Sequence, residues 1–226
     1  MTAPRSAPTL LAVRDLDLRI GPRTLVRGLD LTVRSGDVVA VTGPNGAGKS
    51  TLLRTVAGLR RSDPGAVVYG PAVTEVPGGP RNGVGYAAAT LAAPGALTVT
   101  EFLHLLARLR GSVRMAPDVL GLGPCAATPI AALSTGERKK VGVAAAVQHR
   151  PALVVLDEPF EALDDDSMDL VTGEIERVRR RGGAVVLCTH RADRTADLAT
   201  TVVRLGASAT RRGSGTPDTP HPTDAT

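Results

Sequence analysis

The chain of 226 residues lacks several features that would point to other classes of protein. It has no tryptophan and only 2% aromatic residues, so it offers few rings on which nucleic-acid bases could stack. Its two cysteines, Cys125 and Cys188, match no metal-binding spacing, and two unpaired thiols suit a reducing compartment. No apolar run approaches the ~20 residues that cross a bilayer, and residues 1–8 contain no apolar signal-peptide core. We therefore expect a cytoplasmic protein that is neither secreted nor embedded in a membrane.

The residues that are present favour a layered α/β core. Hydrophobic residues make up 42% of the chain and are mostly alanine, valine and leucine, which suit parallel strands covered by helices. The net charge is +5, with basic clusters at residues 60–61, 138–140 and 177–181. A nucleic-acid surface is one reading of this charge, but the scarcity of aromatic residues favours solvated helix faces and phosphate binding. We therefore do not expect nucleic acid to be a partner.

The apolar periodicity predicts the order of the elements. Residues 9–20 and 23–34 alternate apolar and polar residues around Gly21-Pro22, which indicates two antiparallel strands. The further predicted strands are residues 37–42, 65–69, 83–87, 152–157, 184–189 and 201–205. The predicted helices are residues 48–59, 99–149 with breaks at 111–117 and 121–135, 166–181 and 191–199. Residues 1–8 are expected to be frayed and residues 206–226 disordered, because both are rich in small residues and proline.

Residues 43–51, with the sequence GPNGAGKST, carry the most informative motif. They lie between an apolar strand and a helix, and this arrangement predicts a cradle for a polyphosphate. The glycines let backbone amides turn toward the phosphates, Lys49 would reach the β and γ phosphates, and the Ser50 hydroxyl would ligate Mg²⁺. The predicted nucleotide-binding residues are Gly43, Pro44, Asn45, Gly46, Ala47, Gly48, Lys49, Ser50 and Thr51.

Two acidic residues follow a second apolar strand. Asp157 and Glu158 come directly after residues 153–156, at the strand end where open α/β sheets bind ligands. Asp157 is predicted to share Mg²⁺ with Ser50, and Glu158 to orient or deprotonate the attacking water. His190 follows the next strand, so we expect it at the same edge of the sheet.

A third motif lies at residues 133–140, with the sequence LSTGERKK. Ser134 and Glu137 have the spacing of a capping box, which by itself explains the motif as a helix start. The same helix start, with the Ser134 hydroxyl and the Gly136 amide, is also an anion site. We expect it to cap the γ phosphate from the side opposite the loop.

Together these motifs resemble those of the nucleotide-binding domain of the ABC ATPase family over residues 9–205. The resemblance implies a P-loop NTPase core with an antiparallel β subdomain and a helical subdomain inserted at about residues 90–147. The segments that carry the resemblance are residues 43–51 (Walker A), 134–137 (signature), 153–158 (Walker B and the catalytic glutamate), 161–164 (D-loop) and 190 (switch histidine).

The resemblance also implies a function. The chain would bind ATP and Mg²⁺ and hydrolyse ATP, with Glu158, His190 and Lys49 as catalytic residues. Ser134 and Gly136 would complete the site of a second subunit, in a homodimer or in a heterodimer with another ABC ATPase. A separate transmembrane permease subunit would hold the protein at the cytoplasmic face of the membrane.

Two positions depart from the family pattern. Ala89 stands where the family has a glutamine that contacts Mg²⁺ or the attacking water, and Ile20 is the nearest equivalent of the aromatic residue on which the family often stacks adenine. Glu137 also adds a negative charge to the signature. From these changes we expect modest turnover and weak selectivity for the base.

Two alternatives stay open from the sequence. A soluble ABC ATPase could act on DNA, ribosomes or iron–sulfur assembly, although the chain has neither a long coiled-coil insertion nor a second nucleotide-binding domain. A low-turnover regulatory subunit is favoured by Ala89 and Ile20. It is opposed by the catalytic set, which is complete: Lys49, Ser50, Asp157, Glu158 and His190.

Overall fold

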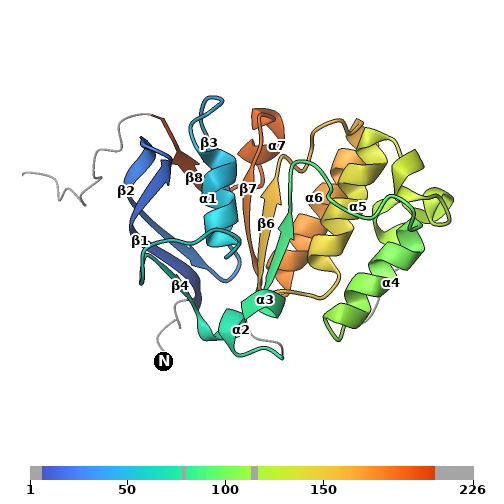
Figure 1. The fold of residues 1–226 in the computed structure, drawn as a ribbon, viewed down its shortest axis with the longest axis horizontal. Coiled ribbons are helices and arrows are strands. Elements are labelled where there is room, and N and C mark those ends of the chain that lie inside the picture. The colour runs from blue at the N-terminus through green and yellow to red at the C-terminus, as the bar shows by residue number, and fades with distance from the viewer. Residues whose placement is uncertain (1–6, 78–79, 113–116, 207–226) are drawn as a thin grey trace, which may run out of the picture.

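The computed structural model describes residues 7–77, 80–112 and 117–206, and Figure 1 shows their arrangement. Most of the segments predicted to be frayed (1–8) and disordered (206–226) therefore lie outside the described residues. A small antiparallel sheet and a larger parallel sheet lie side by side, with the longest helices on the side of the parallel sheet away from the antiparallel sheet (Figure 1).

The antiparallel sheet has the strand order β2-β1-β4. Strand β1 covers Thr9–Ile20 and pairs along its length with β2, Arg23–Arg34, so the predicted hairpin is confirmed. The turn between them uses Gly21 at φ +54°, a left-handed conformation that glycine adopts at little cost. Strand β4, Val67–Tyr69, pairs with the other edge of β1.

The parallel sheet has the strand order β5-β6-β7-β3-β8. Because β6, β7 and β3 are neighbours and run parallel, their carboxyl ends lie together at one edge of the sheet. Any residue that directly follows these strands is thereby brought to a common site. The strands are β3 (Val38–Thr42), β5 (Val84–Ala87), β6 (Leu153–Asp157), β7 (Ala184–Cys188) and β8 (Thr201–Arg204).

Both faces of the central strands are buried, which is why they appear in the sequence as continuous apolar runs. In β6, Val154 and Leu156 pack in one hydrophobic cluster, whereas Leu153 and Val155 pack in the other. Residues of the helices α5 (Thr135–Val147) and α6 (Asp165–Arg180) pack in the first cluster. Residues of helix α1, Lys49–Val56, and of the antiparallel sheet pack in the second.

The helical part beyond β5 agrees with the expected pattern of helices and breaks. Helix α4 covers Val99–Leu109, and three short 3₁₀ turns at 117–120, 123–125 and 130–132 lead to α5. Helix α7, Ala192–Ala196, lies within its predicted range. No helix among the described residues combines the length and the apolar character needed to span a membrane.

Two short helices were not predicted. Helices α2 (Pro71–Thr74) and α3 (Pro80–Gly83) occupy the stretch between β4 and β5. A four-residue helix has no apolar period to detect. In α2 the signals are a proline at the first helical position and one buried side chain, Val73.

Candidate active site at the carboxyl ends of the parallel strands

The glycine-rich loop between β3 and α1 has a backbone that only glycine adopts easily. Gly46 has φ +77° and Gly48 has φ +98°. A Cβ atom on Gly48 would lie 3.1 Å from Cβ of Leu25. The Lys49 ammonium donates hydrogen bonds to the carbonyl oxygens of Gly43 at 2.8 Å and Pro44 at 3.2 Å. These bonds hold a cation beside a turn of backbone amides, as anion binding requires.

Asp157 lies directly beside the start of α1. Its Oδ1 atom is 3.2 Å from the Ser50 hydroxyl oxygen, and the Cys188 thiol donates to the same Oδ1 atom at 2.9 Å. Asp157 is 1% exposed, yet its second carboxylate oxygen, Oδ2, has no hydrogen-bond partner among the described residues. A buried carboxylate oxygen without a partner is costly and indicates a missing cation or donor.

The residues present fit Mg²⁺. This ion prefers oxygen ligands and is usually held by one or two protein groups together with water and substrate phosphates. One carboxylate and one hydroxyl meet that need, and no group of three histidine, cysteine or acidic side chains gathers around a metal-sized space in the described part of the chain. Burial, followed by the hydrogen bond to Asp157, raises the pKa of the Cys188 thiol far above its ordinary value, so the protonated thiol acts as a donor to Asp157.

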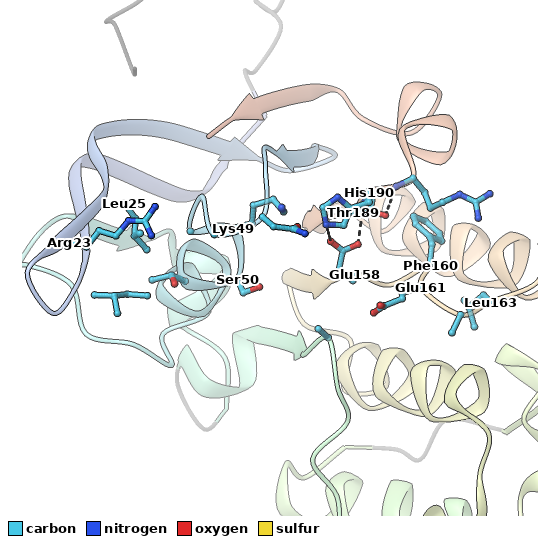
Figure 2. Close-up of a pocket in the computed structure, with 18 residues that line it drawn as sticks. Arg23, Leu25, Lys49, Ser50, Glu158, Phe160, Glu161, Leu163, Thr189 and His190 are labelled. Carbon is cyan, nitrogen blue, oxygen red and sulfur yellow. Dashed lines mark hydrogen bonds and ion pairs between the residues drawn. The ribbon is translucent and has the colours of Figure 1, made fainter. Parts of the chain in front are cut away.

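Glu158 and His190 form a pair, which Figure 2 shows with their side chains in contact. The Oε1 atom of Glu158 is 3.2 Å from Nε2 of His190, and its Oε2 atom accepts the His190 backbone amide at 3.1 Å. The expected position of His190 at the sheet edge of Asp157 is confirmed. Glu158 has φ +51°, a strained conformation for a residue with a side chain, which turns its carboxylate toward the pocket.

One pocket of about 900 Å³ is lined by Lys49, Ser50, Glu158 and His190. Figure 2 shows Lys49, Ser50, Glu158 and His190 around its centre, with side chains of the β1–β2 hairpin toward one end. Sequence reasoning identified Ile20 from the hairpin but missed Arg23 and Leu25. The register pairs Ile20 with Arg23, so only the hairpin alignment could have revealed the arginine. The predicted residues in the lining are Asn45, Gly46, Gly48, Lys49, Ser50, Thr51, Ala89, Glu158 and His190.

Ser134 and Gly136 lie elsewhere. They line a separate hollow of about 400 Å³ at the start of α5, whereas the Lys49 pocket contains neither of them. The capping box is present, because Ser134 Oγ accepts the Glu137 amide at 3.2 Å and the Glu137 carboxylate accepts the Ser134 amide at 2.8 Å. Ala162 and Leu163 line both cavities, so the two sites adjoin through one short segment.

One sequence interpretation needs correction and one needs an addition. The basic cluster at 138–140 was expected to be a solvated helix face. Lys139, however, is only 7% exposed, and its ammonium donates a hydrogen bond to the carbonyl oxygen of Ala89. Its buried position was hidden because α5 has small residues on most of its faces and therefore little apolar periodicity. Cys188 is buried as predicted, and it also donates to the carboxylate of Asp157.

Comparisons with known proteins point to one family. A family profile described as ABC transporter matches residues 26–161. The cytochrome c biogenesis ATP-binding export protein CcmA of Gluconobacter oxydans is 36% identical over 198 residues, which cover 84% of this chain and 88% of the relative. The protein of the same name from Salmonella typhi is 37% identical over 187 residues, which cover 80% of this chain and 89% of the relative.

Solved structures share the fold. A structure described as an ATP binding subunit of an ABC transporter has a TM-score of 0.77 at 27% identity and covers 87% of this chain and 86% of its own. A nucleotide-free ATP-binding cassette from an ABC transporter has a TM-score of 0.70 at 20% identity and covers 87% of both chains. The predicted α/β fold, with a parallel and an antiparallel sheet, is confirmed. The chain belongs to the ABC transporter family, and within it to the ATP-binding, ATP-hydrolysing proteins.

Proposed function

We propose that this chain is the Mg²⁺-dependent ATPase subunit of an ABC exporter and drives a separate membrane-spanning permease subunit from the cytoplasmic face of the membrane. The relatives named as ATP-binding export proteins, which this chain matches over more than four fifths of their length, support export as the direction of transport. The same names support a role in cytochrome c biogenesis.

The observation that carries the proposal is the contact between Ser50 and Asp157. It joins the nucleotide loop to the acidic strand and leaves one buried carboxylate oxygen free for a cation. When bound there, Mg²⁺ would supply positive charge to the phosphate oxygens of ATP. The unpartnered Oδ2 atom of Asp157 supports this reading, because a buried carboxylate oxygen is costly to leave without a donor or a cation.

The other residues have distinct roles in the proposed reaction. The Lys49 ammonium and the loop amides bind the β and γ phosphates, and Lys49 exchanges its two carbonyl partners for phosphate oxygens. The Glu158 carboxylate orients the attacking water and accepts its proton. His190 holds Glu158 through its ring and its backbone amide, and senses the γ phosphate from the same position. Catalysis is therefore mostly positioning and charge stabilisation.

The proposed ATPase works as a dimer. Ser134 and Gly136 lie outside the Lys49 pocket of their own chain, which supports a role at the pocket of a second subunit. There, the amino end of α5 would add its positive dipole end and its free amides to the γ phosphate. The partner is a second copy of this chain or another ABC ATPase.

The test is ATP hydrolysis by the purified chain over a series of protein concentrations, with and without Mg²⁺, beside a Glu158→Gln variant. We expect specific activity to rise with protein concentration, to depend on Mg²⁺ and to fall at least about a hundredfold in the variant. ATP binding should persist in Glu158→Gln, because the loop is intact. Equal rates of hydrolysis by both proteins would show that Glu158 does not activate the attacking water. ATP binding without hydrolysis, even with added permease, would favour the low-turnover regulatory subunit.

A further inference from the structure

Lys139 is a buried cation that contacts two walls of the ATP pocket. It lies in the second turn of α5 and is 7% exposed. Its Nζ atom donates to the carbonyl oxygen of Ala89 at 2.5 Å and lies 3.6 Å from Oε2 of Glu161. Ala89 and Glu161 both line the pocket that contains Lys49. Burying an ammonium is costly unless it is paired and hydrogen-bonded, so this arrangement is a specific one.

The two contacts join segments that are distant in the sequence. Ala89 follows β5 on the connection toward α4, and it offers the pocket only a methyl group and its backbone. Glu161 belongs to the turn of residues 158–162 that follows β6. The Lys139 ammonium donates to the Ala89 carbonyl oxygen and pairs with the Glu161 carboxylate, so α5 contacts both segments through one atom.

The turn that Lys139 contacts is strained at both ends. Glu158 has φ +51° and Ala162 has φ +59°, and residues with side chains hold such angles only where their surroundings impose them. The Glu161 amide donates to the carbonyl oxygen of Glu158 at 3.2 Å, so a shift of Glu161 is passed directly to Glu158. A contact on Glu161 is therefore well placed to hold the Glu158 carboxylate in position.

We propose that Lys139 is a positioning residue that fixes the Ala89 segment against the turn of residues 158–162 and thereby aligns Glu158 for ATP hydrolysis. This inference rests on the proposed role of Glu158. It assigns a function to a side chain that touches neither the nucleotide nor the attacking water. Through Lys139, a movement of the connection between β5 and α4 would also change the position of Glu158.

The first test uses Lys139→Met, which keeps the apolar stem and removes the charge. We expect kcat to fall about tenfold, while the Kd of a fluorescent ATP analogue stays within about twofold. Lys139→Arg keeps a cation and should return kcat to within about threefold of the wild-type value. Arg179→Met is the matched control. It removes a cation on α6 that is more exposed than Lys139 and pairs with Glu176 at 3.0 Å, and it should leave kcat unchanged.

A second variant guards against a simple loss of folding. The Glu161 side chain is 64% exposed, so Glu161→Gln removes the anion without disturbing the core. It should lower kcat about threefold at an unchanged melting temperature. Wild-type kcat in both Lys139→Met and Glu161→Gln would overturn the inference, and so would a loss explained entirely by unfolded protein.

A third measurement does not depend on turnover. Hydrogen exchange of the nucleotide-free protein should become several-fold faster in residues 88–92 and 158–163 of Lys139→Met, and stay unchanged in the β1–β2 hairpin. If the wild-type chain does not hydrolyse ATP, the proposed function fails and exchange alone decides the inference. Unchanged exchange in both segments would overturn it, even if the wild-type chain is an active ATPase.

Discussion

At the scale of single residues, Ile20 is one of the two positions at which this chain departs from the pattern of its family. Ile20 is 53% exposed and lies in the pocket wall with Arg23 and Leu25. An isoleucine can pack on a base but offers no π face. A base bound at this end would meet apolar contacts from Ile20 and Leu25, which do not distinguish adenine from guanine, and the guanidinium of Arg23, which can donate to O6 and N7 of guanine.

We predict that Ile20→Tyr tightens ATP binding. A ring at this position can stack on the base, and stacking of a base on an aromatic side chain contributes about 1–3 kcal/mol. Part of that is already present as contact with isoleucine, so we expect Kd for ATP to fall about three- to tenfold. Calorimetric titration with ATP, GTP and tripolyphosphate measures this. Ile20→Leu is the control, and an equal gain for tripolyphosphate would place the effect on the phosphates instead.

Residue chemistry could be predicted from the sequence wherever a residue directly follows a strand. Asp157, Glu158 and His190 were placed correctly relative to one another because parallel strands end at one edge of the sheet. Lys139 and Arg23 were not identified. Their positions depend on the packing of α5 and on hairpin register, neither of which leaves a local pattern.

At the scale of elements, two helices begin with a capping box of the same kind, but we propose that only one of these helix starts contributes to the binding of ATP. Thr98 and Glu101 cap α4, and Ser134 and Glu137 cap α5. Both caps satisfy amide groups that a helix start leaves unpaired, so each should stabilise the fold to a similar degree. Only the start of α5 is proposed to face ATP.

We predict that Thr98→Ala and Ser134→Ala each lower the free energy of unfolding by about 1 kcal/mol. Ser134→Asp keeps a capping oxygen and should retain most of the stability, but its negative charge would repel the γ phosphate. We therefore expect ATPase activity to survive in Thr98→Ala and to be lost in Ser134→Asp. Urea unfolding and hydrolysis assays on the three variants separate the two roles. Full activity in Ser134→Asp would show that the α5 start is a cap and nothing more.

Strong elements were predictable because their signals are local. The strands β6 and β7 are buried on both faces and appear as apolar runs, and the caps of α4 and α5 have their own sequence pattern. Helices α2 and α3 are single turns, so the fold around them decides whether they form.

At the scale of the whole molecule, the carboxyl ends of three helices lie close to the amino ends of the parallel strands, at the edge of the sheet opposite the ATP pocket. Arg110 caps the carboxyl end of α4, Arg181 caps that of α6, and His149 follows that of α5. A guanidinium nitrogen of Arg110 lies 2.8 Å from Nε2 of His149. Burial, followed by the charges of Arg110 and Arg181, lowers the pKa of His149 from 6.5 to about 4, although the nearby backbone of Val84 opposes the shift.

We predict that this histidine makes the fold sensitive to mild acid. Below pH 6.5 the unfolded chain binds a proton at His149, whereas the folded chain stays unprotonated there until about pH 4. Because the unfolded state binds more protons, the free energy of unfolding decreases as the pH falls through this window. The contribution of neutral His149 to stability is fully present above the window. With a discount for partial exposure, the loss between pH 7.5 and pH 5 is about 1–2 kcal/mol.

Urea unfolding of the wild-type chain and of His149→Gln at both pH values checks this prediction. The glutamine can bond Arg110 but does not titrate, so the variant should lose about 1–2 kcal/mol less stability than the wild type between pH 7.5 and pH 5. Burial also raises the pKa of Glu174, which favours the fold as the pH falls and therefore acts against the effect of His149. Since Glu174 is present in both proteins, the difference between their two pH dependences isolates His149. An identical loss in the two chains would mean that His149 is protonated in the folded state.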